Sequence, residues 1–297
     1  MKPAPFLYVA PRTVEEAVAL LQEHGTDAKL LAGGQSLMPL INMRLARPEV
    51  LVDLNEVRTL DYITEVDGEV RIGAMTRQRA VERSPFVATH VPLLSEALRW
   101  VGHPQIRNRG TIGGSLAHAD PSAELPAVAA ALDAVFVARG PDGVRLLAPG
   151  EFFVSFLTTA LEPAEMLVEV RFAVPSAPAG CAFLELSRRH GDFALVGAAA
   201  VVRLDSGRCR DVRLALTGVG PTPVRVREVE EALLDQPPTE ARLADLSRGI
   251  GPRLDPVSDI HASAEYRRHV AGVLARRALA AAAARAQAVG GGEDSPS

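Results

Sequence analysis

The spacing of apolar residues over the first 174 positions predicts alternating helices and short strands. Apolar positions within residues 14–21 recur along one face of a helix, and Thr13 followed by Glu16 fits a capping box at its start. Asp67-Gly68 lies between two apolar runs and is a strong signal for a β-hairpin. We therefore expect helices at residues 14–24, 37–45, 77–83, 93–101 and 125–132, and strands at residues 29–31, 50–54, 62–66, 69–72, 134–138 and 166–174.

One stretch, residues 103–123, shows neither helical nor strand periodicity and is expected to form a long loop. Long ordered loops are uncommon in compact domains unless they carry function. This stretch contains Thr111-Ile112-Gly113-Gly114-Ser115, a glycine-rich motif. The segment is therefore a candidate binding region.

The pattern changes after a Pro- and Gly-rich segment at residues 175–180, which is the best candidate linker. Two strands are expected around the turn Asp205-Ser206-Gly207, as an antiparallel pair. They span residues 195–204 and 209–217, and helices are expected at 224–234, 240–248 and 264–288. We predict an α+β domain at residues 1–174, a smaller α+β domain at 175–288, and a disordered tail at 289–297.

Two glycine motifs are the main candidates for chemistry. Ala32-Gly33-Gly34-Gln35-Ser36 lies between a predicted strand and a predicted helix, and Thr111–Ser115 resembles it. Paired glycines allow close backbone approach and can present N–H groups to an anion such as a diphosphate. Each motif alone is also compatible with an ordinary tight turn, whereas the two together could close on one extended nucleotide. Neither matches the Rossmann fingerprint or a P-loop.

Composition and charge exclude several other classes of function. The formal net charge of −4 gives no basic surface for nucleic acid or anionic lipid, and no apolar run reaches the ~20 residues that span a bilayer. The first residues carry no signal-peptide pattern, so we expect a cytoplasmic protein. Cys181 and Cys209 cannot supply the ligands of an iron–sulfur cluster, and no metal-ligand or nucleophile–His–acid pattern is present. A redox function would therefore need an organic cofactor.

Four segments, in this order, resemble the FAD-binding medium subunit of the carbon monoxide dehydrogenase and xanthine dehydrogenase family of molybdenum hydroxylases. They are AGGQSLMPLINMRLARPEVLVDLN (32–55), GHPQIRNRGTIGGSLAHADPSAELP (102–126), SRRHGDFALVG (187–197) and LTGVGPTPVR (216–225). The resemblance covers roughly residues 1–285. It implies a two-lobed FAD-binding domain of the PCMH type, followed by a small C-terminal domain with an antiparallel sheet and helices.

The resemblance also implies which residues contact FAD. Both glycine motifs would wrap its diphosphate and ribityl chain, an acidic residue would hold the flavin, and an apolar pair would flank the rings. The implied contacts are Ala32, Gly33, Gly34, Gln35, Ser36, Leu37, Gly110, Thr111, Gly113, Gly114, Ser115, Ala117, Asp120, Glu124, Met166, Leu167 and Phe193. No catalytic residue and no metal ligand is expected, because the flavin itself carries the redox chemistry.

The chain departs from the family pattern at three positions. Phe193 stands where many relatives carry tyrosine, His118 where asparagine is common, and Glu124 where aspartate is common. Nearby charges have ordinary interpretations as well. We expect Arg107 and Arg109 to be solvated, and residues 188–192 to contain an internal salt bridge.

By resemblance the chain is an electron-transfer subunit. A large molybdopterin subunit would oxidise substrate, and a small 2Fe-2S subunit would pass electrons to FAD on this chain, for delivery to NAD⁺, a quinone or O₂. The implied assembly is a dimer of heterotrimers. Two alternatives are a free-standing FAD-dependent oxidoreductase and a non-redox nucleotide-binding scaffold subunit. The chain's residues identify neither the substrate of the complex nor its acceptor.

Overall fold

The computed structural model describes residues 2–175 and 177–290, which form two compact units. Among these residues, unit 1 contains 2–84, 103–119 and 134–172, and unit 2 contains 85–102, 120–133, 173–175 and 177–290. The chain therefore passes between the units several times. Most of the tail that we predict to be disordered, residues 291–297, lies outside the described residues.

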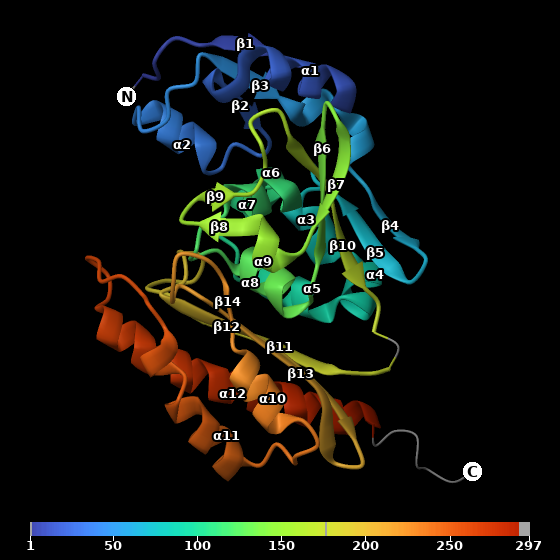
Figure 1. Ribbon diagram of the computed structural model, residues 1–297, viewed down its shortest axis with the longest axis vertical. Helices are drawn as coiled ribbons and strands as arrows, with labels where there is room; N and C mark the ends of the chain where they lie inside the picture. Colours follow the sequence, from blue (N-terminus) through green and yellow to red (C-terminus); the bar gives the residue numbers. More distant parts are fainter. Residues whose placement is uncertain (1, 176, 291–297) are drawn as a thin grey trace. The chain divides into compact units, whose positions relative to one another are not determined.

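Unit 1 begins with a parallel three-stranded sheet of order β1-β3-β2, which α1 covers (Figure 1). Thr13 caps α1 by accepting the backbone N–H of Glu16 at 3.1 Å, as the sequence predicts. The Glu16 carboxylate accepts the N–H of Arg12 at 2.7 Å, one residue before the expected partner. These elements are β1 (Leu7–Val9), α1 (Val14–His24), β2 (Ala28–Leu31), α2 (Leu37–Asn42) and β3 (Val50–Asp53).

A five-stranded sheet of order β4-β5-β10-β6-β7 forms the rest of unit 1. Its β4–β5 hairpin turns at Asp67-Gly68, where both residues have positive φ, as predicted. The strands are β4 (Ile63–Val66), β5 (Glu69–Gly73), β6 (Val135–Gly140), β7 (Gly143–Leu147) and β10 (Met166–Ala173), with a small hairpin of β8 (Phe153–Ser155) and β9 (Thr158–Thr159). The helices are α3 (Gln78–Arg83), α6 (Pro104–Arg109), α7 (Ile112–His118) and α9 (Pro149–Phe152).

The stretch that we expected to be a long loop, residues 103–123, contains two short helices, so that prediction is wrong. Pro104 occupies the first turn of α6, where its missing N–H costs nothing. Thr111 caps α7 by accepting the N–H of Gly114 at 3.0 Å, and Ala119 ends the helix in the left-handed region with φ 52°. Helices this short show too few turns for a periodic pattern, which is why the sequence suggested a loop.

Unit 2 is built on an antiparallel sheet of order β11-β12-β13-β14. α12 packs along β11 and β12 (Figure 1). The alanines of α12 share a core with Ala182, Ala198 and Ala200. Within unit 2, α5 and α8 contact the same sheet. The elements are α4 (Pro85–His90), α5 (Pro92–Leu98), α8 (Glu124–Ala131), β11 (Gly180–Leu186), β12 (Val196–Asp205), β13 (Arg208–Thr217), β14 (Val224–Arg225), α10 (Arg227–Leu233), α11 (Glu240–Arg248) and α12 (Ala264–Gly290).

Two strands of unit 2 differ from the sequence prediction, and helix α4 was not predicted either. β11, which forms one edge of the sheet, was not predicted. The first residues of the expected helix 224–234 instead pair with β13 as β14, and α10 begins only at Arg227. In both cases the pairing partner lies elsewhere in the chain, and pairing with it outweighs local preference. The predicted α+β class is confirmed.

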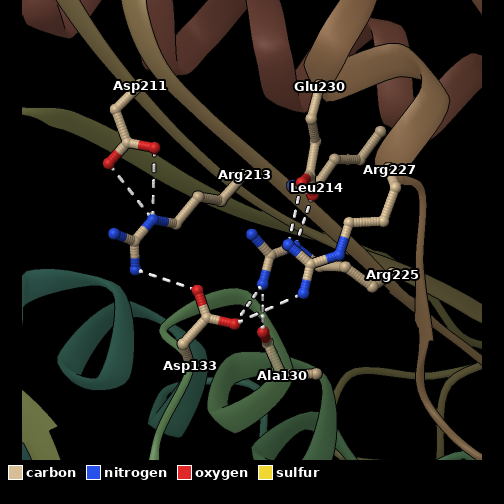
Figure 2. Close-up of polar contacts among 8 residues, drawn as sticks. All are labelled: Ala130, Asp133, Asp211, Arg213, Leu214, Arg225, Arg227 and Glu230. Carbon is tan, nitrogen blue, oxygen red and sulfur yellow. Dashed lines mark hydrogen bonds and ion pairs between the residues drawn. The ribbon is translucent and has the colours of Figure 1, made fainter. Parts of the chain in front are cut away.

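An ion-pair cluster joins the end of α8 to β13, β14 and α10 in unit 2 (Figure 2). The Asp133 carboxylate lies 2.8 Å from Arg225 and 3.5 Å from Arg213. Glu230 is buried, pairs with Arg225 and accepts the backbone N–H of Leu214 at 2.8 Å. Because each buried charge here has a partner of opposite charge, the cluster holds these elements of unit 2 together.

Candidate functional site

The first glycine motif lies directly against the second motif and the two residues that precede it, Arg109 and Gly110, although Gly33 and Gly110 are 77 positions apart in the sequence. A Cβ atom on Gly33 would lie 2.3 Å from the Arg109 carbonyl oxygen and 2.8 Å from the Gly110 Cα. A Cβ on Gly114 would lie 3.2 Å from the Cβ of Ala32. Only glycine permits this approach, so the motifs form one joined backbone surface.

The first motif leaves successive backbone donors free. Gly34 has φ 72°, a conformation that glycine adopts without strain, and the Gln35 side chain donates to the Gly33 carbonyl at 2.9 Å. Within the described residues, the N–H groups of Gln35, Ser36 and Leu37 donate to no other group of the chain. Three consecutive free N–H groups are suited to bind the oxygens of a phosphate.

The second motif differs, which corrects the expectation that it presents the same donors. Its N–H groups are already used: Ile112 donates to Thr76 O at 3.0 Å and Gly113 to Ala74 O at 2.9 Å. Gly114 and Ser115 donate to the side chain and carbonyl of Thr111. The second motif therefore contributes close packing and the half-buried Ser115 and Ala117 side chains instead of an N–H cradle.

Arg107 is not solvated, contrary to the expectation from sequence. It is buried and makes a two-point ion pair with Glu82 of α3, at 2.9 Å from Nε and 3.1 Å from Nη2. Arg109 is exposed, as expected. The Arg107 pair holds α6, and hence the approach to Gly110, against α3.

The apolar pair Met166–Leu167 begins β10 in unit 1. The Met166 side chain is fully buried and packs in the core with Val52, Leu54 and Met75, and Leu167 is also buried. These side chains therefore serve the core of the domain.

The remaining predicted residues belong to unit 2 and are described within it. Asp120 accepts the N–H of Ser122 at 2.8 Å, and Glu124 begins α8 with 3% of its surface exposed. Phe193 is 57% exposed. Within the described chain, the expected salt bridge in residues 188–192 is absent, and Arg188 instead contacts His261 at 3.0 Å.

Sequence reasoning missed Glu185, a second acidic residue that interacts with Glu124 inside unit 2. Glu185 on β11 is buried, and neither carboxylate oxygen has a hydrogen-bond partner. A hydrogen bond from the Ser187 hydroxyl to Glu185 would lower the pKa of Glu185. This hydroxyl instead donates to the Arg189 carbonyl oxygen at 2.9 Å. Burial, reinforced by the charge of Glu124, raises the pKa of Glu185 to about 8. No local sequence pattern distinguishes this glutamate from an exposed strand residue.

We expect Glu185→Gln to stabilise unit 2 at neutral and alkaline pH. Between the ordinary glutamate pKa of about 4.3 and the folded value, the folded state keeps a proton that the unfolded chain releases, so the free energy of unfolding of the wild type falls as pH rises, by up to about 1.4 kcal/mol per pH unit. Glutamine does not titrate, so the free energy of unfolding of the variant lacks this decrease with pH. The stability advantage of the variant over the wild type should therefore disappear toward pH 4–5. Urea unfolding across that range measures it, with the exposed Glu231→Gln as control. An advantage that does not change with pH would contradict a protonated Glu185.

FAD fits this arrangement. Its diphosphate needs closely approachable backbone and N–H donors, which Gly33, Gly34 and the free donors of residues 35–37 provide. Within the described residues there is no cluster of His, Cys, Asp and Glu that could hold a metal ion. Among the same residues, no helix is long and apolar enough to cross a membrane.

Comparison with known proteins identifies the domains of the chain. The family described as "FAD binding domain in molybdopterin dehydrogenase" matches residues 4–176, and the "CO dehydrogenase flavoprotein C-terminal domain" matches residues 181–282. The chain is 46% identical over 290 residues to the 6-hydroxypseudooxynicotine dehydrogenase complex subunit alpha of Paenarthrobacter nicotinovorans, covering 97% of both chains. It is 41% identical to the carbon monoxide dehydrogenase medium chain of Hydrogenophaga pseudoflava, covering 96% of this chain and 99% of that one.

The fold agrees equally well with a solved structure. Carbon monoxide dehydrogenase from Hydrogenophaga pseudoflava superposes with a TM-score of 0.94 at 42% identity, covering 96% of this chain and 99% of that chain. The cofactor of the chain is FAD, and the chain is an oxidoreductase subunit. It belongs to the family of FAD-binding medium subunits of the carbon monoxide and xanthine dehydrogenases, the molybdenum hydroxylases.

Proposed function

We propose that the chain accepts electrons from a 2Fe-2S partner subunit and passes them through FAD to NAD⁺, a quinone or O₂. The observation that carries this proposal is the contact of Gly33 with Arg109 and Gly110, which makes one surface of two distant glycine motifs. FAD supplies the redox chemistry when bound. The role of the chain is then to bind and orient FAD.

The predicted contacts divide by what their atoms can offer. The N–H groups of residues 35–37 are proposed to bind the diphosphate, because they are free donors. The second motif, with Gly110, Thr111, Gly113 and Gly114, would support the first by close packing. Ser115, Ala117, Asp120, Glu124, Met166, Leu167 and Phe193 stay predicted contacts by resemblance, as does the division of the chain near residue 174.

The proposed partners are a large molybdopterin subunit and a small 2Fe-2S subunit, as a dimer of heterotrimers. Support comes from full-length similarity to chains that are named as a subunit of a complex or as a medium chain. The described residues contain no metal-ligand cluster of their own, so iron–sulfur centres would have to lie on another chain. A cytoplasmic location also stays a prediction.

The test is to purify the chain in its native assembly and to identify the flavin released on denaturation. We expect close to one FAD per copy of the chain, together with co-purifying iron and molybdenum. Substrate of the molybdenum subunit should bleach the flavin absorbance in the assembly but not in the isolated chain.

Other outcomes favour the alternatives. Bleaching of the isolated chain by an organic substrate would indicate a free-standing oxidoreductase. An assembly that turns over normally after FAD is removed would indicate a scaffold subunit. An assembly that contains no flavin would overturn the proposal.

A further inference from the structure

The side chain of Arg77 forms hydrogen bonds that connect the regions of the two glycine motifs. Its Nη1 donates to the Arg109 carbonyl oxygen at 2.5 Å, and its Nη2 donates to Asn55 Oδ1 at 2.6 Å. Its backbone also pairs with Thr111 in an isolated antiparallel bridge. Arg77 is therefore fixed to the second motif by its main chain, and to Arg109, two residues before that motif, by its side chain.

Asn55 completes the connection to the first motif. Its Nδ2 donates to the Ala32 carbonyl oxygen at 3.2 Å, and it also contacts the Asp53 carboxylate. The continuous path is thus Ala32 to Asn55 to Arg77 to Arg109. The Arg109 carbonyl at its end is the same atom against which Gly33 packs. Arg77 therefore bonds to the point at which the two motifs meet.

Arg77 makes no close ion pair in the described chain. No carboxylate lies within 4.0 Å of its guanidinium, and the same holds for the neighbouring Arg109. Partial burial, followed by the nearby Arg109 cation, lowers the pKa of Arg77. Asp53 and Asp61 only partly oppose this effect. An unpaired, half-buried guanidinium is costly unless an anion offsets it.

We infer that Arg77 is a positioning residue for FAD, which fixes the spacing of the two glycine motifs and supplies positive charge that favours the diphosphate. This inference rests on the proposed FAD site. Arg77 and Asn55 belong to neither glycine motif. Their proposed role is to hold the first motif against the second. The charge acts at a distance through the joined loops, so no direct bond to the ligand is required.

The experiment compares FAD release from the purified native assembly, followed by flavin fluorescence at about 0.05 M and about 0.5 M NaCl. Arg77→Gln removes both the bridge and the charge. Arg77→Lys keeps the charge but cannot reproduce the two-point contact of the guanidinium. Asn55→Ala keeps the charge and breaks the connection to Ala32. The exposed Arg58→Gln is the charge-matched control.

We expect Arg77→Gln to release FAD at least about tenfold faster at low salt, with a weaker acceleration by salt than the wild type shows. Arg77→Lys should release FAD at an intermediate rate and keep the salt response of the wild type. Asn55→Ala should release faster without losing that response, and Arg58→Gln should match the wild type. Where Arg77→Gln does not fold, the lysine and Asn55 variants carry the test.

Wild-type release rates in Arg77→Gln would overturn the inference. The claim that the charge of Arg77 favours FAD would be overturned by a different result. In that result Arg77→Lys releases FAD as fast as Arg77→Gln, and both variants keep the salt response of the wild type. Absence of FAD from the wild-type assembly would instead refute the proposed function, so the two failures are distinguishable.

Discussion

Replacing Gly33 with valine is expected to weaken FAD binding and to lower the flavin content of the assembly. The first Cβ atom would lie 2.3 Å from the Arg109 carbonyl oxygen and 2.9 Å from its carbon, and both are backbone atoms that cannot rotate away. The two motifs must therefore separate. Overpacking of this kind costs about 1–3 kcal/mol, which corresponds to a loss of FAD affinity of about 5- to 150-fold. Flavin content of the purified assembly measures the effect.

The matched control is Gly150→Ala in α9, also in unit 1. A Cβ there has no atom within 4 Å, and its φ is not in the left-handed region. Its flavin content should equal that of the wild type. Full FAD content in Gly33→Val would mean that the contact between the motifs is not needed for binding. Circular dichroism separates unfolding from a specific loss of FAD. An unfolded variant changes the spectrum, whereas a folded variant that has only lost FAD keeps the spectrum of the wild type.

Replacing Gly180 with valine is expected to cause the largest loss of stability. Gly180 begins β11 under α12, and a Cβ would lie 1.9 Å from the Ala282 carbonyl oxygen and 2.4 Å from the Ala286 nitrogen. Helix α12 would have to move away from the sheet and expose part of the alanine-rich core of unit 2. We expect a decrease in the free energy of unfolding of about 3 kcal/mol or more, measured by urea titration.

Gly220→Ala is the control for this variant. Its Cβ would make only ordinary contacts, at 3.4 Å from Val224 and 3.7 Å from Thr222. We expect its free energy of unfolding to stay within about 0.5 kcal/mol of the wild type. Equal stability of the two variants would show that α12 can shift on β11 at little cost.

The sequence predicted most elements because their signals are local. The Thr13 cap, the Asp67-Gly68 hairpin and the Asp205-Ser206-Gly207 turn depend on neighbouring residues, and all three are present. The two glycine motifs and the cofactor class followed from motif order and resemblance. The errors were short elements, such as α6, α7 and β14, in which too few residues show a period or the pairing partner is distant.

By itself the sequence determined most of the element types, the positions of both glycine motifs and, through the resemblance that they carry, the kind of cofactor. Only the tertiary structure decided which backbone donors stay free, since the N–H groups of the second motif are used by Thr76, Ala74 and Thr111. It also decided that Arg107 is buried and that Arg77 makes no ion pair with any of the described residues. The physical reason is that burial and hydrogen-bond satisfaction arise from contacts between residues far apart in the chain, which local periodicity does not encode.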